Sequence, residues 1–172
     1  SIKLIPWIES ALAIVNAHEI CTSSDRIIAV AFGAEDFTND MEIQRREDDR
    51  ELAYPRSAVA IAANAADVLA LDTPFFAFRD PEALRENSNE SRVFGFRGRF
   101  AIHPAQVDII NEVYCPSVEE IQHAKAVIAA FDEAVAQGRG STSLDGKVVD
   151  VPVVKRAQAL LELADSMSAA RE

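Results

Sequence analysis

Short apolar runs alternate with helical patterns along the first two thirds of the chain. Four runs have the length and composition of buried strands, at residues 4–8, 27–32, 68–71 and 99–102. Helical patterns follow them at residues 11–21, 57–66, 81 onward and 104–114, with a charged loop expected before residue 57. Four successive strand–helix units predict an α/β fold with a parallel sheet and right-handed crossovers.

The number of units leaves two architectures open. A complete (β/α)8 barrel needs about 250 residues and eight units, roughly twice what is present. The segment is therefore either a small open α/β sheet or half of a barrel, and the pattern does not choose between them. Because the chain opens directly on a strand-like run, we expect further units upstream of it.

A different pattern begins near residue 117. Residues 118–137 predict a long amphipathic helix and residues 138–141 a flexible break, while the Asp145-Gly146 pair predicts a β-hairpin. Pro152 marks the first turn of a final helix that is expected to reach about Ser166. We therefore expect a first domain at 1–116 and an extension at 117–172, which needs its own barrel or a neighbouring subunit to pack on.

The composition of the chain argues against several kinds of binding partner. The chain has 172 residues, 49% hydrophobic and 26% charged, which is typical of a globular domain. A formal net charge of -11 argues against a nucleic-acid surface, and no apolar run is long enough to span a membrane. Cys21 and Cys115 lie far apart, so neither a disulfide nor a zinc site is expected. These features favour a reducing cytoplasmic location, or the mitochondrial matrix if a leader lies upstream.

Polar side chains with possible chemical roles follow each predicted strand. Glu9, Asp36, Asp72 and His103 come after the first, second, third and fourth strands. Ligands of parallel α/β folds bind beyond the carboxyl ends of the strands, and paired carboxylates suit Mg²⁺. A single acidic residue at such a place is more often solvated or a helix cap, so Glu9 and Asp36 form a metal-site hypothesis only as a pair.

The segment around Asp36 adds backbone donors. Gly33 permits a sharp turn, after which the N–H groups of Ala34, Glu35 and Asp36 are expected to face a ligand carboxylate. His103 either orients its own loop or contacts a ligand.

Two other polar features have a plain structural explanation. Asp150, two residues before Pro152, is interpreted from the pattern as a helix N-cap. Arg45 and Arg46 belong to a mixed-charge segment, which favours a solvated loop over phosphate binding.

Several segments, taken together, resemble the citrate lyase beta-chain-like family of the HpcH/HpaI aldolase superfamily, which includes malyl-CoA and citramalyl-CoA lyases. They are residues 5–10 (IPWIES), 33–37 (GAEDF), 98–106 (GRFAIHPAQ), 114–117 (YCPS) and 145–152 (DGKVVDVP). Their order and spacing carry the resemblance, which covers nearly the whole chain. It implies the C-terminal half of a (β/α)8 TIM barrel, strands five to eight, with an extension that reaches a neighbouring subunit in a trimer or hexamer.

The resemblance also implies a role for each candidate. Glu9 and Asp36 would hold Mg²⁺, while the backbone of Gly33, Ala34 and Glu35 would hold the carboxylate of an α-keto acid. The acyl-CoA would lie against two further residues, Ile102 and His103, and the catalytic acid/base of the neighbouring subunit's site would be Asp150. An arginine that steadies the thioester carbonyl belongs to the half of the family's barrel that has no match here.

The implied activity is a magnesium-dependent lyase that cleaves or forms a C–C bond in a 3-hydroxyacyl-CoA such as malyl-CoA or citramalyl-CoA. The products would be glyoxylate or pyruvate plus an acyl-CoA. Three alternatives stay open: a malyl-CoA thioesterase, a class II-type aldolase on free hydroxy-keto acids, and a truncated, non-catalytic assembly subunit.

Overall fold

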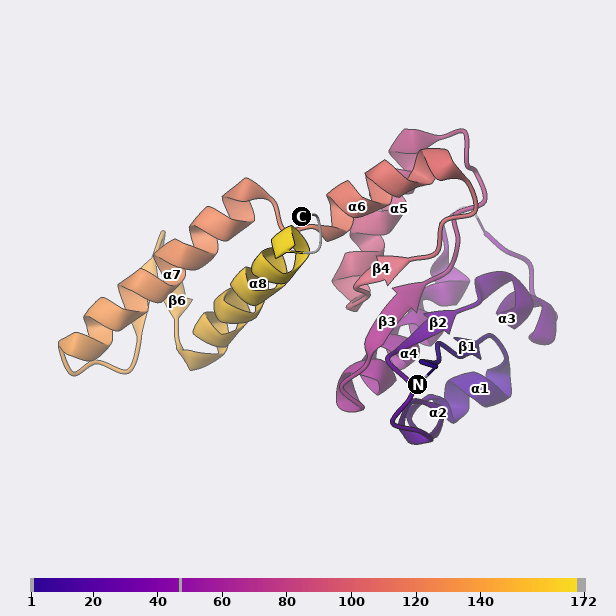
Figure 1. The fold of residues 1–172 in the computed structure, drawn as a ribbon, viewed down its shortest axis with the longest axis horizontal. Coiled ribbons are helices and arrows are strands. Elements are labelled where there is room, and N and C mark those ends of the chain that lie inside the picture. The colour runs from indigo at the N-terminus through magenta and orange to yellow at the C-terminus, as the bar shows by residue number, and fades with distance from the viewer. Residues whose placement is uncertain (1, 47, 170–172) are drawn as a thin grey trace. The chain divides into compact units, whose positions relative to one another are not determined.

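The first of two compact units contains a parallel sheet (Figure 1). The computed structural model describes residues 2–46 and 48–169, and its units are Ser1–Tyr114 and Cys115–Glu172. The four strands lie in the order β1-β2-β3-β4, with bounds Trp7–Ile8, Ala29–Phe32, Leu69–Asp72 and Gly98–Arg99. Every neighbouring pair is parallel, which confirms the predicted α/β class.

The helices of this unit differ from the prediction at several places. They are α1 (Ala11–Val15), α2 (Ala17–Thr22), α3 (Ala34–Asp40), α4 (Ala53–Ala65), α5 (Pro81–Phe94) and α6 (Val107–Tyr114), with short 3₁₀ turns η1 (Arg50–Leu52) and η2 (Pro104–Gln106). The single helix predicted at 11–21 is broken at Asn16, whose side-chain amide donates to the Leu12 carbonyl, a local bond that competes with helix. The loop predicted between β2 and residue 57 is wrong at both ends. Helix α3 lies at its start, and η1 and the first turn of α4 lie at its end.

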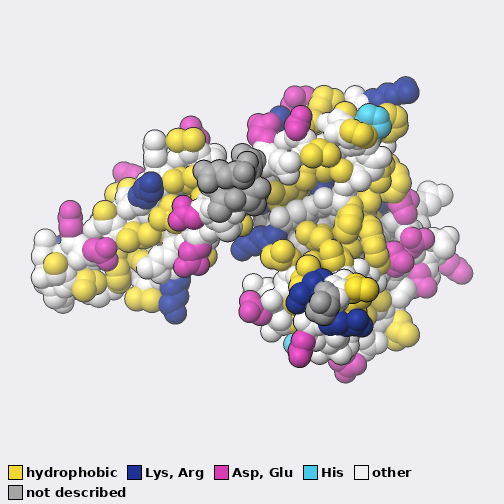
Figure 2. All heavy atoms as spheres, in the orientation of Figure 1, with side chains coloured by type: hydrophobic (Ala, Val, Ile, Leu, Met, Phe, Trp, Pro, Cys, Tyr) yellow, Lys and Arg dark blue, Asp and Glu magenta, His cyan; other side chains and the backbone are white. Residues whose placement is uncertain are grey.

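The two faces of the sheet have different surroundings. Ile8, Val30 and Phe32 point to the face covered by α4 and are completely buried. Trp7 and Leu69 alternate with them and remain 41% and 52% exposed on the other face. Figure 2 shows hydrophobic side chains across the first unit in the region of the sheet. One face therefore belongs to the core and the other presents apolar side chains to solvent.

The second unit is a pair of helices joined through a hairpin. Its elements are α7 (Val118–Ala136), β5 (Thr142–Leu144), β6 (Lys147–Val149) and α8 (Val151–Ala169). Asp145 and Gly146 both have positive φ, as a tight two-residue hairpin turn requires, which confirms the Asp-Gly prediction. The core of the unit consists of Ala124, Val127, Val149, Val154 and Ala157. None of the described helices is both long and apolar enough to cross a bilayer.

Candidate metal centre

Glu9 is fixed between the end of β1 and the start of α1. The N–H of Gly33 donates to the Ile8 carbonyl at 3.1 Å, so the ends of β1 and β2 lie side by side. Directly after Glu9, the hydroxyl of Ser10 accepts the N–H of Ala13 at 3.2 Å and caps α1. The carboxylate of Glu9 therefore projects from a short, constrained turn at the carboxyl edge of the sheet.

Gly33 supplies the space that this carboxylate occupies. Its backbone is extended, with φ -106° and ψ 91°, so any residue type could adopt the conformation. A Cβ at this position, however, would lie 2.5 Å from Glu9 Oε2 and 2.6 Å from Glu9 Cβ. Glycine is required here for close approach to Glu9, not for an unusual turn.

Helix α3 carries Asp36 to the same edge. Glu35 and Asp36 occupy its first turn, where negative side chains complement the helix dipole. The N–H of Ala34 donates to Thr73 Oγ1 at 3.2 Å, which ties the start of α3 to the residue after β3. Asp40, at the other end of α3, accepts the N–H of Ala11 at 2.7 Å. The position of Asp36 is thus set by contacts at both ends of its helix.

Glu9 and Asp36 act on each other electrostatically. Burial, and then the negative charge of Asp36, raise the pKa of Glu9 above its usual value. Two like charges held together in this way are relieved by a cation. Their oxygens are the hard ligands that Mg²⁺ prefers, and Mg²⁺ is commonly held by only one or two carboxylates with water and substrate oxygens. Within the described part of the chain, no group of three or more His, Cys, Asp or Glu side chains is placed to hold a metal ion.

A cavity of about 320 Å³ opens beside the two carboxylates. It is lined by Trp7, Glu9, Gly33, Ala34, Glu35, Asp36, Thr73, Pro74 and Phe76. The structure therefore brings together the predicted metal pair and the predicted backbone segment. Sequence reasoning missed Trp7, Thr73 and Phe76, although Thr73 directly follows a strand and the strand-end rule would have identified it.

Asp72 does not line this cavity. The expectation that it lies with the other polar residues at the strand ends is wrong. It is completely buried, and its oxygens accept from Arg56 Nη2 at 3.2 Å and Arg99 Nη2 at 3.0 Å. Successive strand residues point to opposite faces. Asp72 therefore faces the helices, whereas Thr73 lines the cavity.

His103 orients its own loop and also lines a second cavity. Its Nδ1 accepts the N–H of Ala105 at 3.1 Å, which caps η2, and its ring stacks on Phe78 with centroids 5.0 Å apart. The neighbouring Ile102 is 48% exposed, and its N–H donates to the side chain of Gln106. This cavity, of about 500 Å³, is lined by Phe78, Arg79, Pro81, Leu84, His103, Ala105 and Ile109.

Asp150 lies in the second unit, immediately before α8. Its Oδ1 accepts the N–H of Val153 at 3.3 Å, so the N-cap expected from the pattern is present. The side chain is only partly buried, and this bond occupies one of its two oxygens.

Known proteins share sequence with this chain over most of its length. The family model of the HpcH/HpaI aldolase/citrate lyase matches residues 1–104. Citrate lyase subunit beta of Leuconostoc mesenteroides is 44% identical over 92% of this chain and 53% of its own length. Mitochondrial citramalyl-CoA lyase of Mus musculus is 33% identical over 96% of this chain and 51% of its own length. The chain thus spans about half the length of these relatives.

A solved structure shows the same likeness in three dimensions. The protein CitE of Mycobacterium tuberculosis, in complex with magnesium, acetoacetate and coenzyme A, matches with a TM-score of 0.82 at 31% identity. The match covers 95% of this chain and 61% of CitE. The resemblance found in the sequence motifs is confirmed, and the chain belongs to the HpcH/HpaI aldolase/citrate lyase family.

Proposed function

We propose that the protein is a magnesium-dependent lyase that cleaves or forms a C–C bond in a 3-hydroxyacyl-CoA such as malyl-CoA or citramalyl-CoA. The observation that carries the proposal is the pairing of Glu9 and Asp36 at one cavity, with Gly33 leaving room for the Glu9 side chain. Relatives named citrate lyase subunit beta and citramalyl-CoA lyase support the reaction class. The CitE complex supports magnesium and coenzyme A as ligands.

Glu9 and Asp36 would hold the Mg²⁺ ion, which when bound supplies a Lewis acid for the oxygen that becomes the keto group. The substrate carboxylate would lie against the start of α3, along the backbone of Gly33, Ala34 and Glu35. Because the Ala34 N–H already donates to Thr73, the other first-turn N–H groups are the donors left for this task. Trp7 on the wall of the cavity would help to exclude water from the reacting carbons.

The acyl-CoA would enter beside Ile102 and His103. His103 presents a ring already stacked on Phe78, next to an apolar cavity, which suits the apolar part of a thioester. In cleavage the substrate hydroxyl would lose its proton to water, its oxygen would become the keto group, and the broken C–C bond would leave an enolate of the acyl-CoA. The protonated Asp150 of a neighbouring subunit would donate a proton to the enolate carbon. In the direction of synthesis the same carboxylate would remove that proton. The products would be glyoxylate or pyruvate and an acyl-CoA.

The sheet would be strands five to eight of a (β/α)8 barrel. The rings of Trp7, on β1, and Phe100, just after β4, lie 4.9 Å apart although two strands separate them. Neighbouring strands are about 4.8 Å apart, so these two would be about 14 Å apart in a flat sheet. Curvature toward the exposed apolar face supports this architecture, as does the exposure of Leu69 on that face. A trimer or hexamer would bring Asp150 to a neighbour's site.

The test is cleavage of malyl-CoA and citramalyl-CoA by the full-length protein with and without Mg²⁺. Keto acid is trapped as a hydrazone, and free thiol is measured in parallel. Glu9→Gln and Asp36→Asn should each lower magnesium-dependent keto acid release by at least about 100-fold. Glu90→Gln and Asp108→Asn, at exposed positions on α5 and α6, are the matched controls.

Other results would identify the alternatives. Thiol release without keto acid would indicate a thioesterase, and turnover of free hydroxy-keto acids would indicate a class II-type aldolase. A folded protein with neither product would indicate a non-catalytic assembly subunit. Unchanged keto acid release in both metal-site variants would contradict the assignment of Glu9 and Asp36.

A further inference from the structure

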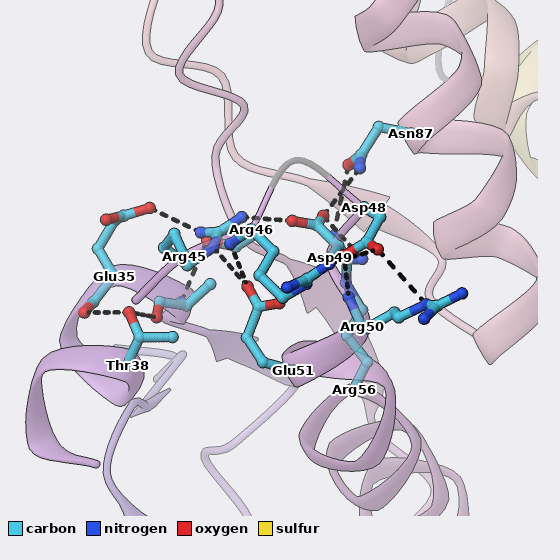
Figure 3. A network of polar contacts seen from close by, with 12 residues as sticks. Glu35, Thr38, Arg45, Arg46, Asp48, Asp49, Arg50, Glu51, Arg56 and Asn87 are labelled. Carbon is cyan, nitrogen blue, oxygen red and sulfur yellow. Dashed lines mark hydrogen bonds and ion pairs between the residues drawn. The ribbon is translucent and has the colours of Figure 1, made fainter. Parts of the chain in front are cut away.

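A network of charged side chains links helix α3 to the buried side of the sheet (Figure 3). We call it the ion network; its members are Glu35, Arg45, Asp49, Glu51, Arg56, Asp72 and Arg99. They come from α3, the segment before η1, η1 itself, α4, β3 and β4, so the ends of the network are distant in sequence. The proposed reaction assigns chemistry only to the backbone of Glu35 and to none of the other members.

Arg45 is the member next to the metal centre. Its guanidinium donates to Glu35 Oε1 at 2.6 Å, to Asp49 Oδ1 at 2.7 Å and to Glu51 Oε1 at 3.2 Å. Each of its nitrogens, Nη1, Nη2 and Nε, serves one carboxylate. Arg45 is therefore neither a solvated side chain nor one free to bind a phosphate.

Asp49 connects Arg45 to side chains that are buried beneath the sheet. Its Oδ2 accepts from Arg56 Nη1 at 3.1 Å and from Asn87 Nδ2 at 3.0 Å. Arg56 also holds Asp72 at the end of β3, with Nη2–Oδ2 at 3.2 Å. Arg56 and Asp72 are 1% and 0% exposed, so this end of the ion network is anchored in the core.

Arg45 keeps two nearly buried carboxylates in place. The side chains of Asp49 and Glu51 are each only 9% exposed. Glu51 Oε2 is buried and has no hydrogen-bond partner among the described residues, so Glu51 depends on the contacts of its other oxygen. Buried charges persist only when they are paired. Without Arg45, Asp49 would keep its contacts with Arg56 and Asn87, whereas Glu51 would keep only the Arg46 N–H among the described contacts of Oε1.

The start of α3 has no side-chain N-cap, so contacts from other segments contribute to its position. Gly33, the N-cap residue, has no side chain with which to cap the helix. Among the described residues, the side chains outside α3 that hold its first turn are Thr73, which accepts the Ala34 N–H, and Arg45, which pairs with Glu35. Within α3, Thr38 Oγ1 donates to the Ala34 and Glu35 carbonyls. Glu35 directly precedes Asp36, so the orientation of the first turn sets where the Asp36 carboxylate lies.

We propose that Arg45 is a positioning residue of the metal centre, which acts through Glu35 to hold the first turn of α3, and with it Asp36, at the magnesium site. The inference rests on the proposed function, since it assigns Arg45 a role in that site. Arg45 does not touch the metal or the substrate in this account. Through Asp49, Arg45 connects the first turn of α3, which has no side-chain N-cap, to the buried Arg56–Asp72 pair.

The test compares Arg45→Gln with Arg46→Gln. Arg46 is the adjacent residue and is 59% exposed. Its guanidinium forms direct ion-pair contacts with the exposed Asp48, and none with Glu51 within salt-bridge distance among the described residues, which makes it a matched control. Mg²⁺ affinity is measured by calorimetric titration of the full-length protein, and KM and kcat are measured separately. Arg45→Gln should weaken Mg²⁺ binding by about 10- to 100-fold and raise the KM for substrate, while Arg46→Gln leaves both unchanged.

Glu35→Gln is the milder variant, because Glu35 is half exposed and its loss leaves Arg45 paired with Asp49 and Glu51. It should weaken Mg²⁺ binding in the same direction, and the double variant should be no weaker than Arg45→Gln alone. Wild-type affinity in Arg45→Gln, or effects of the two substitutions that multiply, would overturn the proposal. If Arg45→Gln does not fold, wild-type affinity in Glu35→Gln would overturn it.

Hydrogen exchange separates this proposal from the proposed function. Without any ligand, amides of α3 should exchange about tenfold faster in Arg45→Gln than in Arg46→Gln, with those of α6 unchanged as an internal reference. A wild-type protein that binds no Mg²⁺ would overturn both the function and the role of Arg45 in it, whatever the exchange rates. A wild-type protein that binds Mg²⁺, together with unchanged exchange in α3 of Arg45→Gln, would overturn only the role of Arg45.

Discussion

Replacing Gly33 by alanine tests the close approach between β2 and Glu9. The added Cβ would lie 2.6 Å from Glu9 Cβ and 3.3 Å from Trp7 Cε3. Carbon atoms in contact are normally about 3.5–4.0 Å apart, so Glu9 must move by about 1 Å. Rotation of the Glu9 side chain cannot relieve the clash, because the position of its Cβ is fixed by the backbone.

The cost of this substitution follows from two separate effects. Overpacking of this kind destabilises a protein by about 1–3 kcal/mol, and the backbone adds no strain because Gly33 is extended. Mg²⁺ requires oxygens at about 2.0–2.1 Å in nearly ideal octahedral geometry. A shift of about 1 Å in Glu9 therefore removes one of the two carboxylate ligands, and we expect Mg²⁺ affinity to fall by about 10- to 100-fold.

The assay is calorimetric Mg²⁺ titration combined with urea unfolding of Gly33→Ala. Gly140→Ala is the control, because a Cβ at Gly140 would meet nothing within 4 Å. Gly140→Ala should keep wild-type affinity and nearly wild-type stability. Wild-type Mg²⁺ affinity in a folded Gly33→Ala would refute the argument that the empty Cβ position is needed for the Glu9 carboxylate.

Two further predictions concern Asp150 and the ion network. Asp150→Asn should lower turnover by about 100-fold or more while substrate binding is retained. If Asp150 acts on a neighbouring subunit, mixed oligomers of Asp150→Asn chains with Glu9→Gln chains should recover turnover. No recovery would indicate that Asp150 acts in the site of its own chain. Burial raises the pKa of Asp49, but hydrogen bonds from Arg45 and Asn87 and nearby arginine charges outweigh this, so its pKa lies below the usual value. The stability that Asp49 provides is therefore present above the unfolded carboxyl pKa of about 3.9 and is lost as pH falls through the lower folded value. Urea unfolding between pH 7 and about pH 2 should show a smaller acid loss in Asp49→Asn than in wild type; equal losses would contradict this.

The parts of the fold set by local pattern were predictable from the sequence. Apolar runs such as 27–32 located the strands, and Asp145-Gly146 located the hairpin because this pair tolerates positive φ. Helix α3 was not predicted, since it is short and follows a glycine without a side-chain cap. Its acidic first turn, Glu35 and Asp36, was the available signal.

Only those site residues that directly follow a strand could be predicted from the sequence. Glu9 and Asp36 follow strands whose register brings them together, so the pair was found. Asp72 also follows the apolar run of its strand but faces the helices, because its place in the alternation depends on a register that the sequence does not give. The pairing of Arg45 with three carboxylates depends on how distant segments fold together, and a mixed-charge pattern carries no such information.

Calorimetric titration of Mg²⁺ into the full-length protein and into the Glu9→Gln/Asp36→Asn double variant tests the central claim most directly. The two carboxylates line one cavity, and burial, followed by the negative charge of Asp36, raises the pKa of Glu9. A bound cation would stabilise the charged form of Glu9. We expect one Mg²⁺ site per chain in wild type and none in a double variant that remains folded. Mg²⁺ binding of equal affinity in both proteins would contradict it.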